Sequence, residues 1–158
     1  MVRHRRARTV GFVTSSNDRS AAEGTSASIL VVDDHQEIAH LLALLLTATG
    51  YSVVEARSVA EAVDRYRHAG PTQLVITDIG LADGNGAALV ALLGHPMART
   101  LFTSGPPRTA FDGTTAALPP DAAFLQKPCA PSVLLAVVRE LLAAPSPIAP
   151  DPHPPGCT

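Results

Sequence analysis

Residues 29–34 read ILVVDD, and this stretch decides the fold class of the 158-residue chain. Four consecutive apolar residues followed by two acids are typical of a strand that is buried on both faces and ends at a polar edge. Residues 74–78, LVITD, repeat the pattern in the middle of the chain. Two such strands predict a parallel sheet that helices cover on both sides.

Helical patterns alternate with these apolar runs. A capping box of Ser58 and Glu61 predicts the start of one helix, and Gly50 and Gly94 are typical stop signals. The residues expected to face inward are Ile38, Leu41, Leu42 and Leu45, then Val59, Ala62, Val63 and Tyr66, then Gly86, Leu89, Val90 and Leu93, and finally Leu134, Val137, Val138 and Leu141.

Strands are expected at residues 29–32, 51–56, 74–77, 100–103 and 122–126. Their alternation with helices predicts an α/β fold, a flavodoxin-like doubly wound sheet of five parallel strands, for which 2-1-3-4-5 is a common strand order. The fourth helix is expected to be short or degenerate, within residues 109–118, because Gly113 interrupts it and prolines flank it.

Polar side chains follow four of the predicted strands. Asp33 and Asp34 follow the first strand, Asp78 the third, Thr103 the fourth and Lys127 the fifth. In this topology the carboxyl ends meet at one edge of the sheet, where ligands bind. Three neighbouring carboxylates repel one another unless a cation lies between them, and Mg²⁺ suits such a site. The sequence therefore predicts a Mg²⁺ and phosphate site at this edge.

Each of these residues alone has a plainer explanation. An aspartate after a strand is often only a helix cap or a turn former, which would account well for Asp34. The joint pattern is more specific, because Lys127 is the single lysine among twelve basic residues and lies at one of the same strand ends.

The charge is unevenly distributed. The net charge is −2, with +3 on residues 1–28 and −5 on the remainder, so an acidic body argues against nucleic acid as the ligand. No apolar run is long enough to cross a membrane or to form a signal peptide. The two cysteines, Cys129 and Cys157, do not suggest a disulfide. We therefore expect a cytoplasmic protein.

Three regions are expected along the chain. Residues 1–27 are rich in Arg and Ser and predict a disordered arm, either a solvated segment or the product of a misassigned start. Residues 28–143 predict the folded domain. Residues 144–158 form a Pro-rich tail that is expected to be disordered and too short for a DNA-binding output domain.

The strings ILVVDD (29–34), LVITDIGLADGNG (74–86), LFTSG (101–105) and FLQKP (124–128) resemble the receiver domains of bacterial two-component response regulators. The strings DIGL (78–81), LFTSG (101–105) and LQKP (125–128) look like those of receiver modules attached to hybrid histidine kinases. The resemblance covers residues 28–143 and implies a single-domain receiver in a phosphorelay. Such a module is not an enzyme for other substrates. It takes a phosphoryl group from a histidine kinase or a histidine phosphotransfer protein and acts through partner proteins.

The resemblance also implies a role for individual residues. Asp78 matches the phosphoryl acceptor, Lys127 the lysine that contacts the phosphoryl group, Thr103 the hydroxyl that turns inward, and Phe124 the aromatic switch residue. The implied Mg²⁺ ligands are Asp34 directly, Asp33 through water, Asp78, and the backbone carbonyl of Gly80.

Some positions depart from the family pattern. Ala82 replaces a usual proline, Cys129 an aromatic residue, and Ala130 a capping hydroxyl, which puts the usual output surface in question. His35 follows the acidic pair, and we expect it to lie exposed in the first helical turn rather than to bind metal.

Other functions remain as alternatives. A receiver could serve as a phosphate sink without switching. A Mg²⁺-dependent phosphatase of the haloacid dehalogenase type would need Asp-x-Asp after the first strand, whereas Asp33 and Asp34 are adjacent. A flavin binder would need a phosphate-binding loop of Ser, Thr and Gly at that place.

Overall fold

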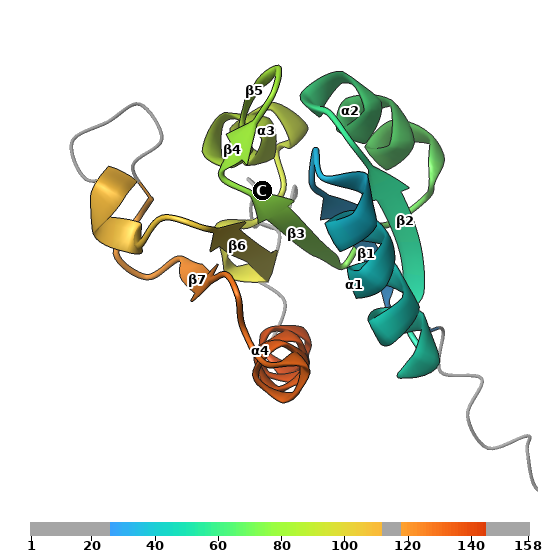
Figure 1. Ribbon diagram of the computed structural model, residues 1–158. Helices are drawn as coiled ribbons and strands as arrows, with labels where there is room; N and C mark the ends of the chain where they lie inside the picture. Colours follow the sequence, from blue (N-terminus) through green and yellow to red (C-terminus); the bar gives the residue numbers. More distant parts are fainter. Residues whose placement is uncertain (1–25, 112–117, 145–158) are drawn as a thin grey trace, which may run out of the picture.

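The structure is a computed structural model that describes residues 26–111 and 118–144 (Figure 1). Five parallel strands form one sheet in the order β2-β1-β3-β6-β7, which confirms the predicted order 2-1-3-4-5. Each predicted strand differs from the observed one by a single residue at one end. The observed strands are β1 (Ser28–Val32), β2 (Ser52–Ala56), β3 (Leu74–Asp78), β6 (Thr100–Ser104) and β7 (Ala123–Gln126).

Helices cover both faces of the sheet (Figure 1). α1 (Gln36–Ala48) and α4 (Pro131–Ala143) pack on one face, and α2 (Val59–His68) and α3 (Gly86–Leu93) pack on the other. Successive strand residues point to opposite faces, so Ile29 and Val31 contact the first pair of helices, and Leu30 and Val32 contact the second. This explains why residues 29–32 of β1 are all apolar.

The buried face of α1 differs from the prediction. Leu41 is 66% exposed, and the buried residues are Ala39, Ala43 and Leu46. Leu42 and Leu45 pack partly against the core. The small side chains of Ala39 and Ala43 allow the helix to lie close to the sheet, and this contact sets its rotation. The sequence LLALLL at 41–46 is apolar on every face, so its periodicity does not specify which side is buried.

The other helices match the prediction more closely. Ser58 caps α2 by accepting a hydrogen bond of 3.1 Å from the backbone N–H of Glu61. Gly94 ends α3 in the left-handed conformation, with φ +64°. The other predicted inward-facing residues are buried or partly buried, and the fully buried ones are Ala62, Gly86, Leu89, Val90, Leu134 and Val138.

The predicted fourth helix is present only as a short 3-10 turn, η2 (Arg108–Phe111), and residues 112–117 of the predicted segment lie outside the described residues. A second 3-10 turn, η1 (Met97–Arg99), precedes β6. A small antiparallel hairpin of β4 (Gly80–Leu81) and β5 (Gly84–Asn85) follows β3 and was not predicted.

Disorder was predicted for residues 1–27 and 144–158, and of these, residues 1–25 and 145–158 lie outside the described residues. Where the chain enters the described part, the backbone carbonyl of Ala27 accepts a hydrogen bond of 2.9 Å from Ser52 N–H. Among the helices of the described ranges, none is both long and apolar enough to cross a membrane.

Candidate functional site

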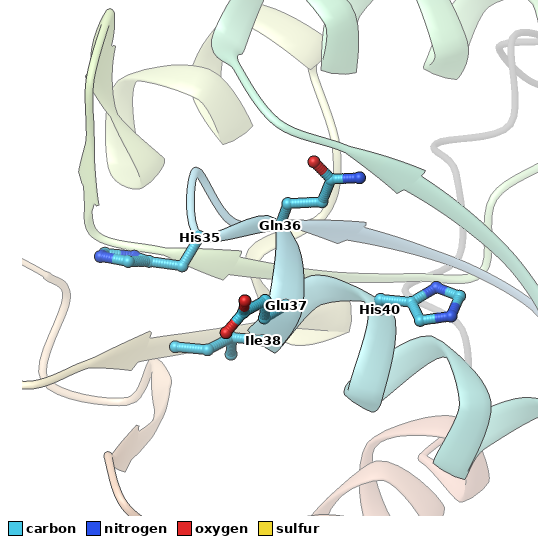
Figure 2. A pocket seen from close by; sticks show the side chains of 5 residues that line it. All are labelled: His35, Gln36, Glu37, Ile38 and His40. Carbon is cyan, nitrogen blue, oxygen red and sulfur yellow. The ribbon is translucent and has the colours of Figure 1, made fainter.

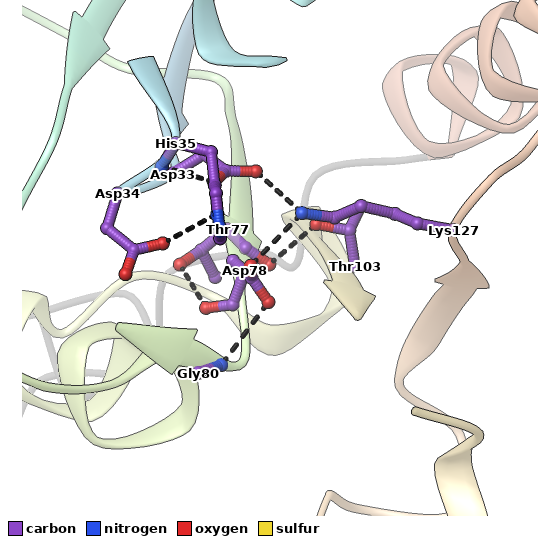
Figure 3. Close-up of polar contacts among 8 residues, drawn as sticks. All are labelled: Asp33, Asp34, His35, Thr77, Asp78, Gly80, Thr103 and Lys127. Atoms are coloured by element: carbon purple, nitrogen blue, oxygen red, sulfur yellow. Dashed lines mark hydrogen bonds and ion pairs between the residues drawn. The ribbon is translucent and has the colours of Figure 1, made fainter. Parts of the chain in front are cut away.

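The carboxyl ends of β1 and β3 bring the aspartates together. β1 pairs directly with β3, with Val32 opposite Thr77, so Asp33 and Asp78 continue from neighbouring strands. Both side chains are almost fully buried. Figure 3 shows Asp33, Asp34 and Asp78 turned toward one small region at this edge, as the sequence predicted.

Lys127 reaches this region from the end of β7. Its Nζ lies 2.6 Å from Asp33 Oδ2 and 3.0 Å from Asp78 Oδ2 (Figure 3). A backbone hydrogen bond of 2.7 Å from Lys127 N–H to Ser104 O fixes the start of the side chain. Burial lowers the pKa of Lys127, but the hydrogen bonds and charges of the two aspartates outweigh it and raise the pKa above its usual value. The two aspartates therefore stabilise the charged form of Lys127.

One lysine does not satisfy three carboxylates. Asp34 Oδ1 is buried and accepts no hydrogen bond, although the His35 ring nitrogen lies 3.1 Å away, outside hydrogen-bonding geometry. A buried carboxylate oxygen that accepts no hydrogen bond is costly, and a divalent cation would be a suitable partner for it. The donor set of this edge therefore fits a metal ion.

The hairpin after β3 shapes the other side of the site. Gly80 N–H lies 3.3 Å from Asp78 Oδ1, and Gly86 N–H donates to Ile79 O at 2.9 Å. A Cβ atom on Gly86 would lie 2.4 Å from the backbone oxygen of Asp78, so only glycine allows α3 to begin this close to β3. The predicted ligand position, Gly80, is thereby held beside the carboxylate of Asp78.

Asp83, at the tip of this hairpin, has a structural role that the sequence did not reveal. Its carboxylate accepts hydrogen bonds from Val59 N–H at 2.8 Å and from Ala60 N–H at 3.2 Å, at the start of α2. The hydrogen bond from Val59 is the main reason why the pKa of Asp83 is lowered. The hairpin is thus tied to a helix that precedes it by 24 residues in sequence, a distance over which local sequence patterns carry no signal.

His35 also belongs to the site, which sequence reasoning missed. It is 67% exposed, as expected, and forms the N-cap position of α1. Its Nδ1, however, lies 3.2 Å from Asp33 Oδ1 and 3.1 Å from Asp34 Oδ1. Ligand atoms of these three residues and Asp78 all lie within 4.8 Å of one another. The sequence signal for this position is that His35 directly follows two acidic residues, Asp33 and Asp34.

Thr103 and Phe124 lie on adjacent strands but on different faces. Thr103 is buried opposite Asp78 in the β3–β6 pairing, and its Oγ1 is 3.5 Å from Thr77 O. Phe124 pairs with Phe102 and packs, half-buried, into the core on the α2 and α3 side. Thr103 instead lines a groove with α1 and α4 residues. The sheet therefore lies between the two side chains.

A pocket opens over Asp78. Among its lining residues are His35, Gly80, Ser104 and Lys127, together with Asp78 itself. The pocket gives a reactant access to the carboxylate of Asp78, which is otherwise buried. Lys127 lines the same pocket and contacts that carboxylate. This arrangement suits nucleophilic attack by Asp78 on an electrophile that carries negative charge.

Comparisons with known proteins agree with this geometry. The profile of the response regulator receiver domain matches residues 29–139. The sensor kinase CckA of Brucella abortus (strain 2308) is 32% identical over 122 residues, which are 74% of this chain but only 13% of that relative.

Two solved structures are also similar. The receiver domain of the hybrid histidine kinase CckA has 28% identity and a TM-score of 0.60, with 73% of this chain and 99% of that chain covered. A CheY-like receiver domain protein from Methanospirillum hungatei JF-1 has 25% identity and a TM-score of 0.63, with 75% and 94% covered. The chain belongs to the response regulator receiver domain family of two-component signalling.

Proposed function

We propose that this chain accepts a phosphoryl group on Asp78 in a Mg²⁺-dependent reaction. The observation that carries the proposal is the position of Asp78: its carboxylate faces an open pocket, 3.0 Å from Lys127 and beside an aspartate oxygen that has no hydrogen-bond partner. The proposed donor is the phosphohistidine of a histidine kinase or of a histidine phosphotransfer protein. A receiver of a hybrid histidine kinase is among the similar structures and supports this choice.

The proposed transfer is a displacement at phosphorus. A carboxylate oxygen of Asp78 attacks, the P–N bond of the phosphohistidine breaks, and its electron pair remains on the imidazole of the donor, so that an acyl phosphate forms. Lys127 holds the carboxylate and can then donate to a phosphoryl oxygen. A Mg²⁺ ion bound by Asp33, Asp34, Asp78 and the carbonyl of Gly80 would neutralise the phosphoryl oxygens.

The test is phosphorylation of the full chain by acetyl phosphate with Mg²⁺, read by intact mass. One phosphoryl mass should appear in the wild type and not in Asp78→Asn. Asp121→Asn, which changes an exposed aspartate away from the site, is the matched control and should react like the wild type. If Asp78→Asn takes up the phosphoryl group at the wild-type rate, Asp78 is not the acceptor. Turnover of a generic phosphomonoester would favour the phosphatase alternative.

We further propose that phosphorylation switches the contacts of this protein with its partners through Thr103 and Phe124. Thr103 has a hydroxyl that can donate to a phosphoryl oxygen on Asp78, its neighbour across the β3–β6 pair. Beryllofluoride with Mg²⁺, a phosphoryl mimic, should change amide hydrogen exchange within residues 103–124 and much less within 35–49. Thr103→Ala should bind the mimic with a smaller change. A wild type that shows no change would be a phosphate sink.

A further inference from the structure

His35 projects from the loop that carries the acidic pair. Its backbone N–H donates to Asp33 Oδ1 at 2.9 Å, which fixes the backbone at the point where the ring leaves it. Figure 2 shows His35 and His40 pointing in different directions from the start of α1, and His40 lies instead 3.3 Å from Glu55. Of these two histidines, only His35 faces the carboxylates of the site.

The distances around the His35 ring fit a shared cation. Nδ1 lies 3.2 Å from Asp33 Oδ1 and 3.1 Å from Asp34 Oδ1. Two ligand atoms that each lie about 2.1 Å from one metal ion, at a right angle, are about 3 Å apart. The nitrogen and the two oxygens therefore already have the spacing of neighbouring ligands, and Asp78 lies within 4.8 Å of all of them.

Hydrogen bonding alone leaves part of this arrangement unexplained. His35 Nδ1 hydrogen bonds Asp33 Oδ1 at 3.2 Å, but its 3.1 Å contact with Asp34 Oδ1 lacks the geometry of a hydrogen bond, and that buried oxygen has no hydrogen-bond partner. The side chain of His35 also makes no capping hydrogen bond to α1. His35 and Asp78 line the same pocket, so the ring and the carboxylates face one space.

Resting on the proposed Mg²⁺ site, we propose that His35 is a nitrogen ligand of the bound cation and widens the selectivity of the site to transition-metal ions such as Ni²⁺. Imidazole suits Ni²⁺ and Zn²⁺, whereas carboxylate and carbonyl oxygens suit Mg²⁺. Ligation would use the lone pair of Nδ1, so it would replace the hydrogen bond between Nδ1 and Asp33 Oδ1 and leave the ring proton on Nε2. Water can hydrate that Nε2–H because the side chain is exposed.

The experiment compares metal binding by the full chain, freed of metal with a chelator, in four forms: wild type, His35→Gln, Asp34→Ala and the control His40→Gln. Calorimetric titration gives the Kd for Mg²⁺ and for Ni²⁺. We expect His35→Gln to weaken Ni²⁺ binding by about tenfold or more and to change Mg²⁺ binding far less. His40→Gln should match the wild type for both ions, and Asp34→Ala should lose both.

A spectroscopic readout identifies the ligand itself. With Mn²⁺ bound, pulsed electron paramagnetic resonance should show a ¹⁴N coupling from one imidazole in the wild type and in His40→Gln, and none in His35→Gln. An unchanged ¹⁴N coupling and Ni²⁺ affinity in His35→Gln would overturn the inference. Tighter binding of both metals in His35→Gln would also overturn it, because the ring would then be a counter-ion that the metal displaces.

The same titrations separate this inference from the proposed function. If the wild type binds Mg²⁺ through Asp34 but His35→Gln behaves like the wild type, only the role of His35 fails. If the wild type binds no Mg²⁺, the proposed function fails together with the inference that rests on it.

Discussion

At the carboxyl edge of the sheet one lysine, Lys127, pairs with only two of three aspartates, whereas at the amino edge each ring nitrogen of His95 has its own partner. His95 Nε2 bonds Arg99 O at 2.9 Å, and Nδ1 bonds the Tyr66 hydroxyl at 3.0 Å. Arg99 in turn donates to Leu142 O at 3.0 Å and to Ala144 O, at the end of α4. The amino edge is a satisfied network.

The difference separates a structural role from a functional one. Buried polar groups that all have hydrogen-bond partners make a structure more rigid, whereas a buried polar group without a hydrogen bond costs free energy. The carboxyl edge leaves Asp34 Oδ1 without a hydrogen bond and holds several acids close together. The electrostatic repulsion among these carboxylates favours the binding of a cation. The amino edge is therefore expected to have only a structural role, whereas the carboxyl edge is expected to carry the chemistry and to depend on Lys127 for its stability.

The largest effect on stability is expected from Lys127→Met. This change leaves Asp33 and Asp78 as buried acids without their cation, and it should lower the free energy of unfolding by about 3 kcal/mol. The measurement is chemical denaturation without divalent metal, with Arg139→Met as a control for loss of an exposed cation. Added Mg²⁺ should restore part of the loss, and equal stability of the two variants would contradict the comparison.

The next effect concerns His95. His95→Ala removes the hydrogen bonds to the Tyr66 hydroxyl and to Arg99 O, and it should lower the free energy of unfolding by about 2 kcal/mol, measured by chemical denaturation at pH 7.5. His40→Ala, which removes an exposed histidine, should cost little by comparison.

His95 should also make stability depend on pH. Burial lowers the pKa of His95 below its usual value of 6.5, so the unfolded chain takes up a proton more readily than the folded chain. The contribution of His95 is therefore fully present above pH 6.5 and is lost as the pH falls from there toward the lowered pKa. Thermal midpoints between pH 7.5 and 5.0 should fall less steeply in His95→Ala than in the wild type. Parallel slopes would contradict this.

Asp78→Asn, a change at the carboxyl edge, should raise the free energy of unfolding, unlike the substitutions of Lys127 and His95. It removes one carboxylate from the cluster and leaves Lys127 paired with Asp33, so the free energy of unfolding should rise by about 1 kcal/mol. Denaturation in the absence of Mg²⁺ measures the change. A clear loss of stability would mean that the Asp78–Lys127 pair stabilises the fold more than the acidic repulsion destabilises it.

The smallest effect is expected from Asp83→Ala, which removes the carboxylate that accepts from Val59 and Ala60 N–H. The thermal midpoint should fall slightly, because α2 loses a cap at an exposed position. Asp83→Asn keeps an acceptor oxygen and should retain most of the stability. If both variants match the wild type, the hairpin is held by its other contacts.

The sequence by itself determined the fold class and the edge at which the site lies. Continuous apolar runs such as Ile29–Val32 are local signals of doubly buried strands, and the residues that follow them must lie at the carboxyl edge in a parallel sheet. The convergence of Asp33, Asp78 and Lys127 follows from that topology and needed no knowledge of side-chain packing.

Only the tertiary structure decided how particular side chains are used. The rotation of α1 depends on the close approach of Ala39 and Ala43 to the sheet, since residues 41–46 are apolar on every side. The contact of Asp83 with α2 joins groups that lie 24 residues apart in sequence. Such contacts depend on distances of a few ångströms between elements, which local propensity and periodicity do not specify.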